Sequence, residues 1–188
     1  TCLIDLDDDG QLDLRIRYVL DNEGQSCSGG CPGQLAYPRH VYVDPTPGNQ
    51  IADSAIAYVN ELSSGDAIDG SLLWGADAGQ LLIEKVGATC TSWLGGSICA
   101  SVNPNGDWGL VSPAIGFVGV QFLIDGQIHY GWVRLRVQYS PGGGINLFLL
   151  DYAYNSVPGE PILAGESLPT SITRIAQSSI QVSPNPFT

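Results

Sequence analysis

Residues 117–139 read FVGVQFLIDGQIHYGWVRLRVQY and predict a β-hairpin. Two runs rich in β-branched and aromatic residues flank Asp125-Gly126, and Asp-Gly between such runs is a strong hairpin signal. Gln127 leaves the length of the loop open. In the second run the side chains alternate between two faces. One face holds His129, Gly131, Val133, Leu135 and Val137, and the other holds Tyr130, Trp132, Arg134 and Arg136.

The alternation continues on both sides of this hairpin. Pro141-Gly-Gly-Gly144 turns the chain into a third strand over residues 145–154, which predicts a meander. Residues 12–20 place Leu12, Leu14, Ile16 and Tyr18 on one face, and Val41–Val43 form a short β-rich piece. Residues 51–62 fit either a short helix or a strand, and residues 63–110 predict short strands with long loops. We expect an all-β fold, an antiparallel β-sandwich or jelly-roll-like arrangement with long Gly-rich loops.

The chain divides into three parts by composition. No fixed-period repeat and no linker occurs before about residue 166. We expect a β-sandwich domain over residues 1–165 and a polar linker over residues 166–181. Residues 182–188 follow as a tail or as the start of a further domain.

Charge excludes two classes of partner. The 188 residues include 19 acidic and 7 basic side chains, a formal net charge of −12. Nucleic-acid backbones and anionic membranes both require a Lys/Arg footprint that this composition does not provide. The longest strongly apolar run, residues 115–124, is too short and too interrupted to span a bilayer.

The cysteines indicate an oxidising compartment. Cys27 and Cys31, and likewise Cys90 and Cys99, bracket glycine-containing loops that a disulfide could close. Neither pair has the spacing of a zinc site. Cys2 is then the odd cysteine, either free, paired between chains, or paired with one of the other four. The chain starts at Thr1 without an apolar leader, so we expect an exported protein whose signal peptide has been removed.

Residues 5–13, DLDDDGQLD, form the sharpest motif. Calcium takes six to eight oxygen ligands, and alternate residues of a tight loop can direct their oxygens to one point. We expect a structural Ca²⁺ site with Gly10 at the sharp turn and with ligands from Asp5, Asp7, Asp9, the Gln11 carbonyl and Asp13. The EF-hand loop would place its last acid at residue 16, which is Ile16 here. The shorter spacing resembles the calcium loops of integrin-type β-propeller repeats. The alternative interpretation is an acidic, solvated terminus.

Catalytic patterns are weak, and we expect no enzyme. Neither His40 nor His129 lies in a nucleophile-elbow or zinc-helix motif. Asp151, Glu160 and Glu166 could supply a carboxyl pair for glycoside hydrolysis, although surface acids are the simpler interpretation. Trp93 and Trp108 lie in Gly/Ser/Asn-rich stretches and are the candidates for stacking on a sugar.

Two stretches resemble known families. Residues 182–188, VSPNPFT, after a polar linker, resemble the opening of the C-terminal sorting domain of type IX secretion cargo in Bacteroidetes. That resemblance implies an exported protein of the cell surface. Asp53-Ser54-Ala55 then matches the O-glycosylation sequon of that phylum, with Ser54 as the acceptor. The YGWVR run, DYAY at residues 151–154 and the following Ala164-Gly165 are similar to secreted bacterial proteins that often carry a PEP-CTERM anchor. The resemblance to that group implies only the fold and a location outside the cell.

Together these features predict an extracellular, non-enzymatic protein of the cell surface or matrix, stabilised by Ca²⁺. A structural or adhesive role fits best, and exposed edge strands together with Cys2 would allow a homo-oligomer or a fibre built by strand addition. The alternative is a carbohydrate-binding module or a polysaccharide-active enzyme, with a polysaccharide as partner.

Overall fold

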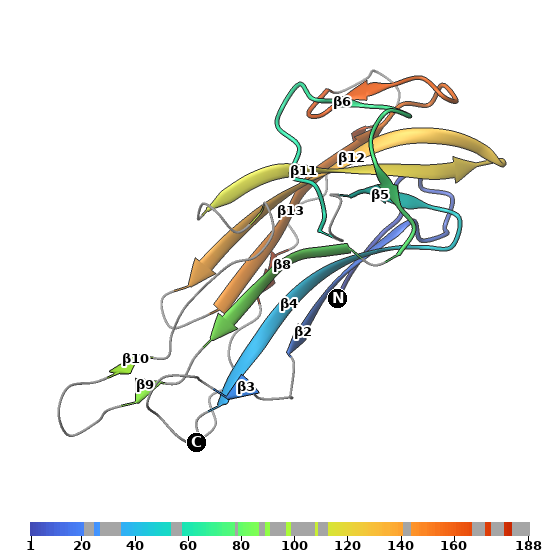
Figure 1. The fold of residues 1–188 in the computed structure, drawn as a ribbon. Helices are drawn as coiled ribbons and strands as arrows, with labels where there is room; N and C mark the ends of the chain where they lie inside the picture. The colour runs from blue at the N-terminus through green and yellow to red at the C-terminus, as the bar shows by residue number, and fades with distance from the viewer. Residues whose placement is uncertain are drawn as a thin grey trace.

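The computed structural model describes residues 1–20, 25–26, 35–53, 58–77, 79–86, 89–90, 97–98, 108, 113–140, 144–166, 172–173 and 179–181. Among these residues the regular structure is antiparallel β-sheet. Within the same residues, no helix has the length and apolar character needed to cross a membrane. The expected all-β antiparallel fold is confirmed, and Figure 1 shows its strands.

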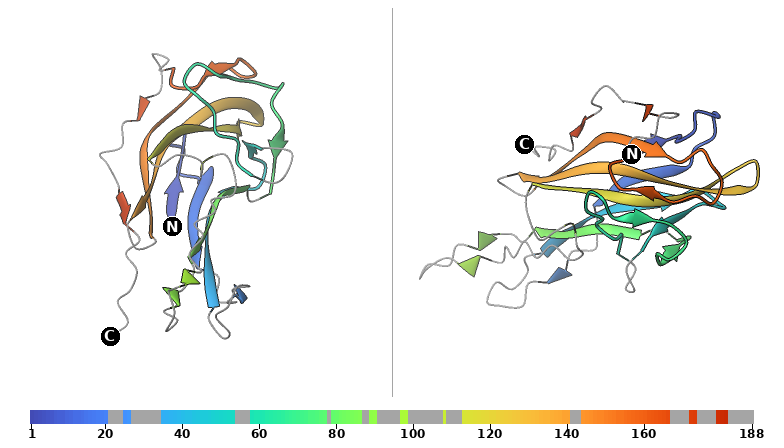
Figure 2. Two further views of the ribbon diagram at one scale, coloured as in Figure 1. Left: turned by 60° about the vertical axis from the view of Figure 1, so that its left-hand side comes forward. Right: turned by 90° about the horizontal axis from the view of Figure 1, so that it is seen from above.

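Two large sheets make up the sandwich. The five-stranded sheet contains β1 (Cys2–Ile4), β2 (Leu14–Leu20), β3 (Gln25–Ser26), β4 (Leu35–Pro45) and β8 (Gly79–Val86). The seven-stranded sheet contains β5 (Gln50–Ala52), β7 (Trp74–Gly75), β11 (Ala114–Ile124), β12 (Gln127–Ser140), β13 (Gly144–Tyr154), β15 (Ile172–Thr173) and β16 (Ser179–Gln181). Figure 2 shows the larger sheet curving over the smaller one.

The main core lies between these two sheets. The smaller sheet contributes Leu14, Ile16, Val41 and Val43, and the larger sheet contributes buried residues from β11, β12 and β13, among them Val118, Val120, Phe122, Val133, Leu135, Val137, Ile145 and Leu147. Burial of apolar side chains from both sheets in a single cluster is the packing expected of a β-sandwich.

The central hairpin agrees with the sequence pattern. Ile124 pairs with Gln127, so the loop is the two residues Asp125 and Gly126. Both have positive φ angles, +50° and +75°, as a type I′ turn requires. The meander continues because β12 pairs antiparallel with β13 from Gly131–Tyr154 to Ser140–Gly144.

A second apolar cluster covers the outer face of the seven-stranded sheet. Phe117, Tyr130 and Trp132 point to this face and pack with Ile68 and Ile162. Those two isoleucines lie on β6 (Ala67–Ile68) and β14 (Ile162–Leu163), which pair with each other above β11 and β12 in Figure 1. The alternation of β12 is thus confirmed, with Val133, Leu135 and Val137 on the inner face and two aromatic residues on the outer face.

Two local expectations change, and one open alternative is decided. Leu12 is not part of the buried face, because β2 begins at Leu14 and Leu12 is 44% exposed in the loop before it. The short piece expected at residues 41–43 belongs to the eleven-residue strand β4. In the region 51–62 the described residues form β5 and a bridge between Asp53 and Val59, which favours the strand over the helix.

The expected linker contains two strands. Both β15 and β16 pair with the outer edge of β13, so residues 172–173 and 179–181 lie along the sandwich. In sequence, β9 (Thr89–Cys90) and β10 (Ser97–Ile98) follow β8 and precede β11. They pair with each other as a two-stranded sheet separate from the two large ones.

Candidate metal centre

The acidic motif is the connection between β1 and β2. Ile4 pairs with Leu14, and the Asp13 amide donates to the Ile4 carbonyl at 2.9 Å, so residues 5–13 form a closed loop. The loop is fixed from inside by Leu6, which is 2% exposed and belongs to the main core.

Three carboxylates of this loop come together. One oxygen from each of Asp5, Asp7 and Asp13 lies within 4.8 Å of the other two. Two ligand oxygens that are each at most about 2.6 Å from a Ca²⁺ ion are at most about 5.2 Å apart. The three oxygens therefore have separations that one calcium ion could bridge.

The carboxylate of Asp5, one of these three residues, has an oxygen that is buried without a hydrogen-bond partner. Asp5 Oδ2 accepts a hydrogen bond from the Gly10 amide at 2.9 Å. Its other oxygen, Oδ1, is inaccessible to solvent and has no hydrogen-bond partner. Leaving a buried carboxylate oxygen unpaired is costly, and a cation is the partner that such an oxygen favours. This atom is the observation in the loop that points to a ligand.

The Asp13 carboxylate is held in place by one main-chain and one side-chain hydrogen bond. It is 7% exposed, its Oδ2 accepts from the Leu6 amide at 2.7 Å, and its Oδ1 accepts from Asn49 Nδ2 at 3.0 Å. Asn49 Oδ1 in turn accepts from the Leu123 amide on β11 at 3.2 Å. A carboxylate oxygen has lone pairs for more than one donor or ion. These hydrogen bonds therefore orient Asp13 and leave lone pairs that can bind an ion.

Electrostatics of the loop favour a bound cation. Burial, followed by repulsion from Asp7 and Asp5, raises the pKa of Asp13 to about 6, although hydrogen bonds from Leu6 and Asn49 act in the opposite direction. Burial also raises the pKa of Asp7, with repulsion from Asp9 and Asp5 adding to it. A nearby positive charge would reverse both effects, because it stabilises the ionised carboxylates.

Asp9 is not among the three clustered carboxylates, and the Gln11 carbonyl stays a predicted ligand. Asp9 accepts from its neighbour Gln11 twice, at 2.6 Å from the backbone amide and at 3.0 Å from Nε2. Both residues are exposed. Gly10 has a φ of +87°, which agrees with the sharp turn assigned to it, and Asp8 has a φ of +59°.

Asn49 and Thr46 were not found by the sequence analysis. The Thr46 amide donates to the Asp13 carbonyl at 3.0 Å, and its Oγ1 lies 3.1 Å from the same oxygen. Asn49 is 36 residues from Asp13 in the chain. Only the pairing of β2 with β4, in which Leu14 lies opposite Pro45, brings the two loops together. No local motif carries that information.

Comparison of the chain with protein-family models, curated proteins and solved structures gives no match. The resemblances to type IX secretion cargo and to PEP-CTERM-type proteins therefore stay predictions.

Other predicted site residues fall into two groups. Trp108 is fully buried in the main core, which corrects its assignment as a stacking residue, because no ring face is left for a sugar. Trp93, Ser54 and three of the paired cysteines, Cys27, Cys31 and Cys99, lie outside the described residues. Cys90 is in β9, where only its backbone is described, and Cys2 on β1 is a free thiol. Both disulfides stay predictions.

Three of the residues considered for catalysis are engaged in structural contacts. His129 is buried, and its Nδ1 lies 2.9 Å from the Asn155 carbonyl. Asp151 forms an ion pair with Arg134 on the neighbouring strand. Glu166 Oε2 accepts from the Leu163 amide at 3.0 Å, which closes the turn after β14.

Proposed function

We propose that this chain is an extracellular, non-enzymatic structural or adhesive protein of the cell surface or matrix whose β-sandwich is stabilised by Ca²⁺. The metal site is supported by one observation. Asp5, whose carboxylate clusters with those of Asp7 and Asp13, has a buried Oδ1 without a hydrogen-bond partner. Three carboxylates on one loop suit a hard cation with oxygen ligands, and main-chain carbonyls and water would complete the shell.

The position of the loop explains why the metal would be structural. The loop joins β1 to β2, and through Asn49 it is connected to β11 of the opposite sheet. An ion bound to Asp13 would therefore stabilise the contact between the two sheets at this end of the sandwich. Extracellular calcium modules bind calcium with dissociation constants of about 10⁻⁴–10⁻³ M. This range matches the calcium concentration outside cells, so the ion would bind without a dedicated delivery system.

Export and surface attachment rest on the residues 182–188 and on the cysteine pattern. The described residues around His129, Asp151 and Glu166 serve packing and ion pairing, which supports a role without catalysis. Carbohydrate binding now depends on Trp93 and stays a prediction.

A calorimetric melt tests the proposal. The purified chain is melted in excess Ca²⁺, in Mg²⁺ and in EDTA. A ligand at one hundred times its dissociation constant stabilises the folded state by about 2.7 kcal/mol. For a chain of this size that corresponds to a rise in Tm of roughly 5–10 °C. We expect this rise with Ca²⁺ and a smaller one with Mg²⁺. Equal melting temperatures in Ca²⁺ and EDTA would overturn the metal and leave a solvated acidic loop.

A further inference from the structure

The outer face of the seven-stranded sheet is covered only in part. The second apolar cluster, with β6 and β14, covers Tyr130 and Trp132 of β12. Ile128 lies two residues before Tyr130 and therefore on the same face of the strand. It is 41% exposed, and its Cα partner Leu123 on β11 is 45% exposed. This pair, near the β11–β12 turn, is an apolar surface that the described residues leave open.

Two neighbouring turns extend this surface. A Cβ at Gly48, in the connection between β4 and β5, would lie 3.3 Å from Leu123 Cδ1, so the Leu123 side chain lies against that connection. On the other side, the Gly159 amide donates to the Ile128 carbonyl at 2.8 Å, which brings the turn after β13 beside β12. That turn contains Val157, which is 54% exposed. We call Leu123, Ile128 and Val157 the tip row.

The segments around the tip row are acidic. Residues 5–13, 46–49, 121–128 and 155–160 gather at one end of the sandwich, as Figures 1 and 2 show. Five acids lie in residues 5–13, and Asp125 and Glu160 are the other two, while none of the four segments contains Lys or Arg. Both Asp125 and Glu160 are exposed, and the Glu160 amide donates to the Val157 carbonyl at 3.3 Å. The tip row is therefore an apolar surface with negative charge on its borders.

We propose that the tip row binds a basic polypeptide segment in which apolar residues are flanked by Lys or Arg. The apolar residues of such a segment would cover Leu123 and Ile128, and its cations would lie near Asp125 and Glu160. Complementary charge of this kind selects partners and speeds their encounter. A second copy of this chain has the same net charge of −12, and an anionic lipid surface is also negative, so charge disfavours both.

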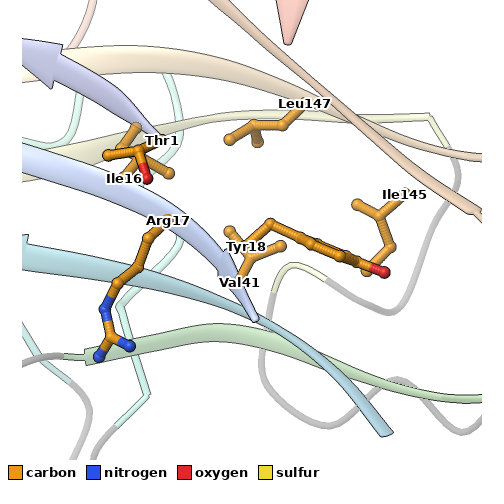
Figure 3. A pocket seen from close by; sticks show the side chains of 7 residues that line it. All are labelled: Thr1, Ile16, Arg17, Tyr18, Val41, Ile145 and Leu147. Carbon is orange, nitrogen blue, oxygen red and sulfur yellow. The ribbon is translucent and has the colours of Figure 1, made fainter. Parts of the chain in front are cut away.

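The apolar pocket between the two sheets has a different charge. Figure 3 shows Ile16 and Val41 of the smaller sheet on one side of it and Ile145 and Leu147 of β13 on the other, with Arg17 among the residues that line it. None of the lining residues in the described structure is acidic. A basic segment therefore fits the tip row and not this pocket. The proposal goes beyond the metal site, because it depends on exposure and charge and needs no bound ion.

Fluorescence anisotropy with three synthetic peptides of equal length tests the proposal. One peptide alternates Leu with Lys, one alternates Leu with Glu, and one alternates Ser with Lys. We expect the full chain to bind the Leu/Lys peptide at least about tenfold more tightly than either of the others. Equal binding of the Ser/Lys peptide would overturn the proposal, because charge alone would then explain the affinity. Equal binding of the Leu/Glu peptide would overturn the argument from charge.

One substitution at two exposed isoleucines locates the surface. Ile128→Ser should weaken binding of the Leu/Lys peptide by about five- to tenfold, because it removes apolar area that the partner covers. Ile115→Ser is the matched control, since Ile115 is 57% exposed at the other end of the same hairpin, opposite Arg136. Its affinity should stay within about twofold of wild type. Equal weakening by the two variants would overturn the assignment to the tip row.

A charge variant keeps the test independent of the apolar substitution. Asp125→Asn/Glu160→Gln removes two charges, and asparagine suits the positive φ of residue 125 in its turn. Affinity for the Leu/Lys peptide at low salt should fall by about threefold or more, and an unchanged affinity would contradict the proposal. Binding to phospholipid vesicles that depends on Ile128 would assign the tip row to lipid instead. All titrations are run in Ca²⁺ and in EDTA, so that loss of the metal proposal leaves this readout intact.

Discussion

The side chain of Asn49 holds the carboxylate of Asp13, with Nδ2 3.0 Å from Oδ1. Its carboxamide oxygen accepts from the Leu123 amide, so one buried side chain connects the acidic loop of the smaller sheet to a central strand of the larger sheet. The stability of the loop and that of the sandwich should therefore depend on each other.

The first prediction concerns Asn49→Ala. Truncation leaves Asp13 Oδ1 and the Leu123 amide without this partner in a buried site, and each such group costs about 1–3 kcal/mol. We expect the free energy of unfolding to fall by about 2–6 kcal/mol, a drop in Tm of roughly 5–25 °C. Denaturant titration and calorimetry in EDTA measure it. The control is Gln50→Ala, which removes one half-buried contact, to Gln121. Similar losses for the two variants would show that Asn49 has no special role.

The second prediction distinguishes an acidic residue that binds the ion from an acidic residue that only lies beside it in sequence. Asp7→Asn preserves an oxygen that can accept the Asp9 amide but removes one charge from the cluster. In EDTA this variant should melt at or slightly above the wild-type temperature, because repulsion among the acids is relieved. In Ca²⁺ it should lose most of the stabilisation, with affinity at least about tenfold weaker by titration calorimetry, a difference of about 1.4 kcal/mol.

Asp8→Asn is the matched control for that variant. It makes the same change of charge at the adjacent residue, and asparagine tolerates the positive φ of Asp8. Calcium affinity should stay within about threefold of wild type, a difference of less than about 1 kcal/mol. If both variants weaken calcium equally, the loop attracts the ion only through its summed charge.

The third prediction is a pH dependence of the metal-free protein. Asp13 has a folded pKa of about 6 against the usual 3.8, so the folded state holds this proton more tightly than the unfolded state does. The stabilisation is complete below about pH 4 and is lost as the pH rises through about 6. At full ionisation the difference corresponds to roughly 3 kcal/mol.

Melting temperatures in EDTA should therefore fall between pH 4 and pH 7, and saturating Ca²⁺ should remove the fall. Asp13→Asn, which cannot ionise, should show a flatter profile in EDTA over the same range. A wild-type profile in EDTA that is flat, or that rises with pH, would contradict the assignment of this proton to Asp13.

The hairpin and its flanking strand were predictable because their causes are local. Asp125-Gly126 supplies the two positive φ angles of the turn, and the period-two alternation of residues 128–137 assigns each side chain to a face. Leu12 also fits the alternation, yet it lies in the loop. The spacing of the motif includes Asp13 among the ligands, but it cannot show that Asn49, which is distant in sequence, holds the Asp13 carboxylate.

The candidate site was predictable in outline only. Spacing alone identifies five ligand positions, and the structure brings three of the carboxylates together. Asp9 has the same spacing, but its carboxylate accepts a hydrogen bond from the Gln11 amide, a local contact that short acidic side chains commonly make. Trp108 was misassigned for a related reason, since a Gly/Asn-rich neighbourhood in sequence does not show that the aromatic residue within it reaches the core.

The last prediction concerns the glycine between the two outer-face aromatics. Gly131 lies between Tyr130 and Trp132 on β12, with Val120 and Tyr154 as its strand partners. A Cβ at this position would lie 2.8 Å from the Ala153 carbonyl oxygen and 3.0 Å from Tyr154 Cβ. Because the nearest atom belongs to the backbone of β13, Gly131→Ala requires the two strands to separate locally. We expect a loss of about 1–3 kcal/mol, as for other overpacked interiors.

Gly126→Asn is the control for this strand. Gly126 has a positive φ, which asparagine tolerates better than most residues, and a Cβ at this position would have no atom within 4 Å. Its Tm should stay within roughly 2 °C of wild type, while that of Gly131→Ala should fall by roughly 3–10 °C. If Gly131→Ala melts like wild type, β12 and β13 do not approach each other at this position as closely as the distances to Ala153 and Tyr154 imply.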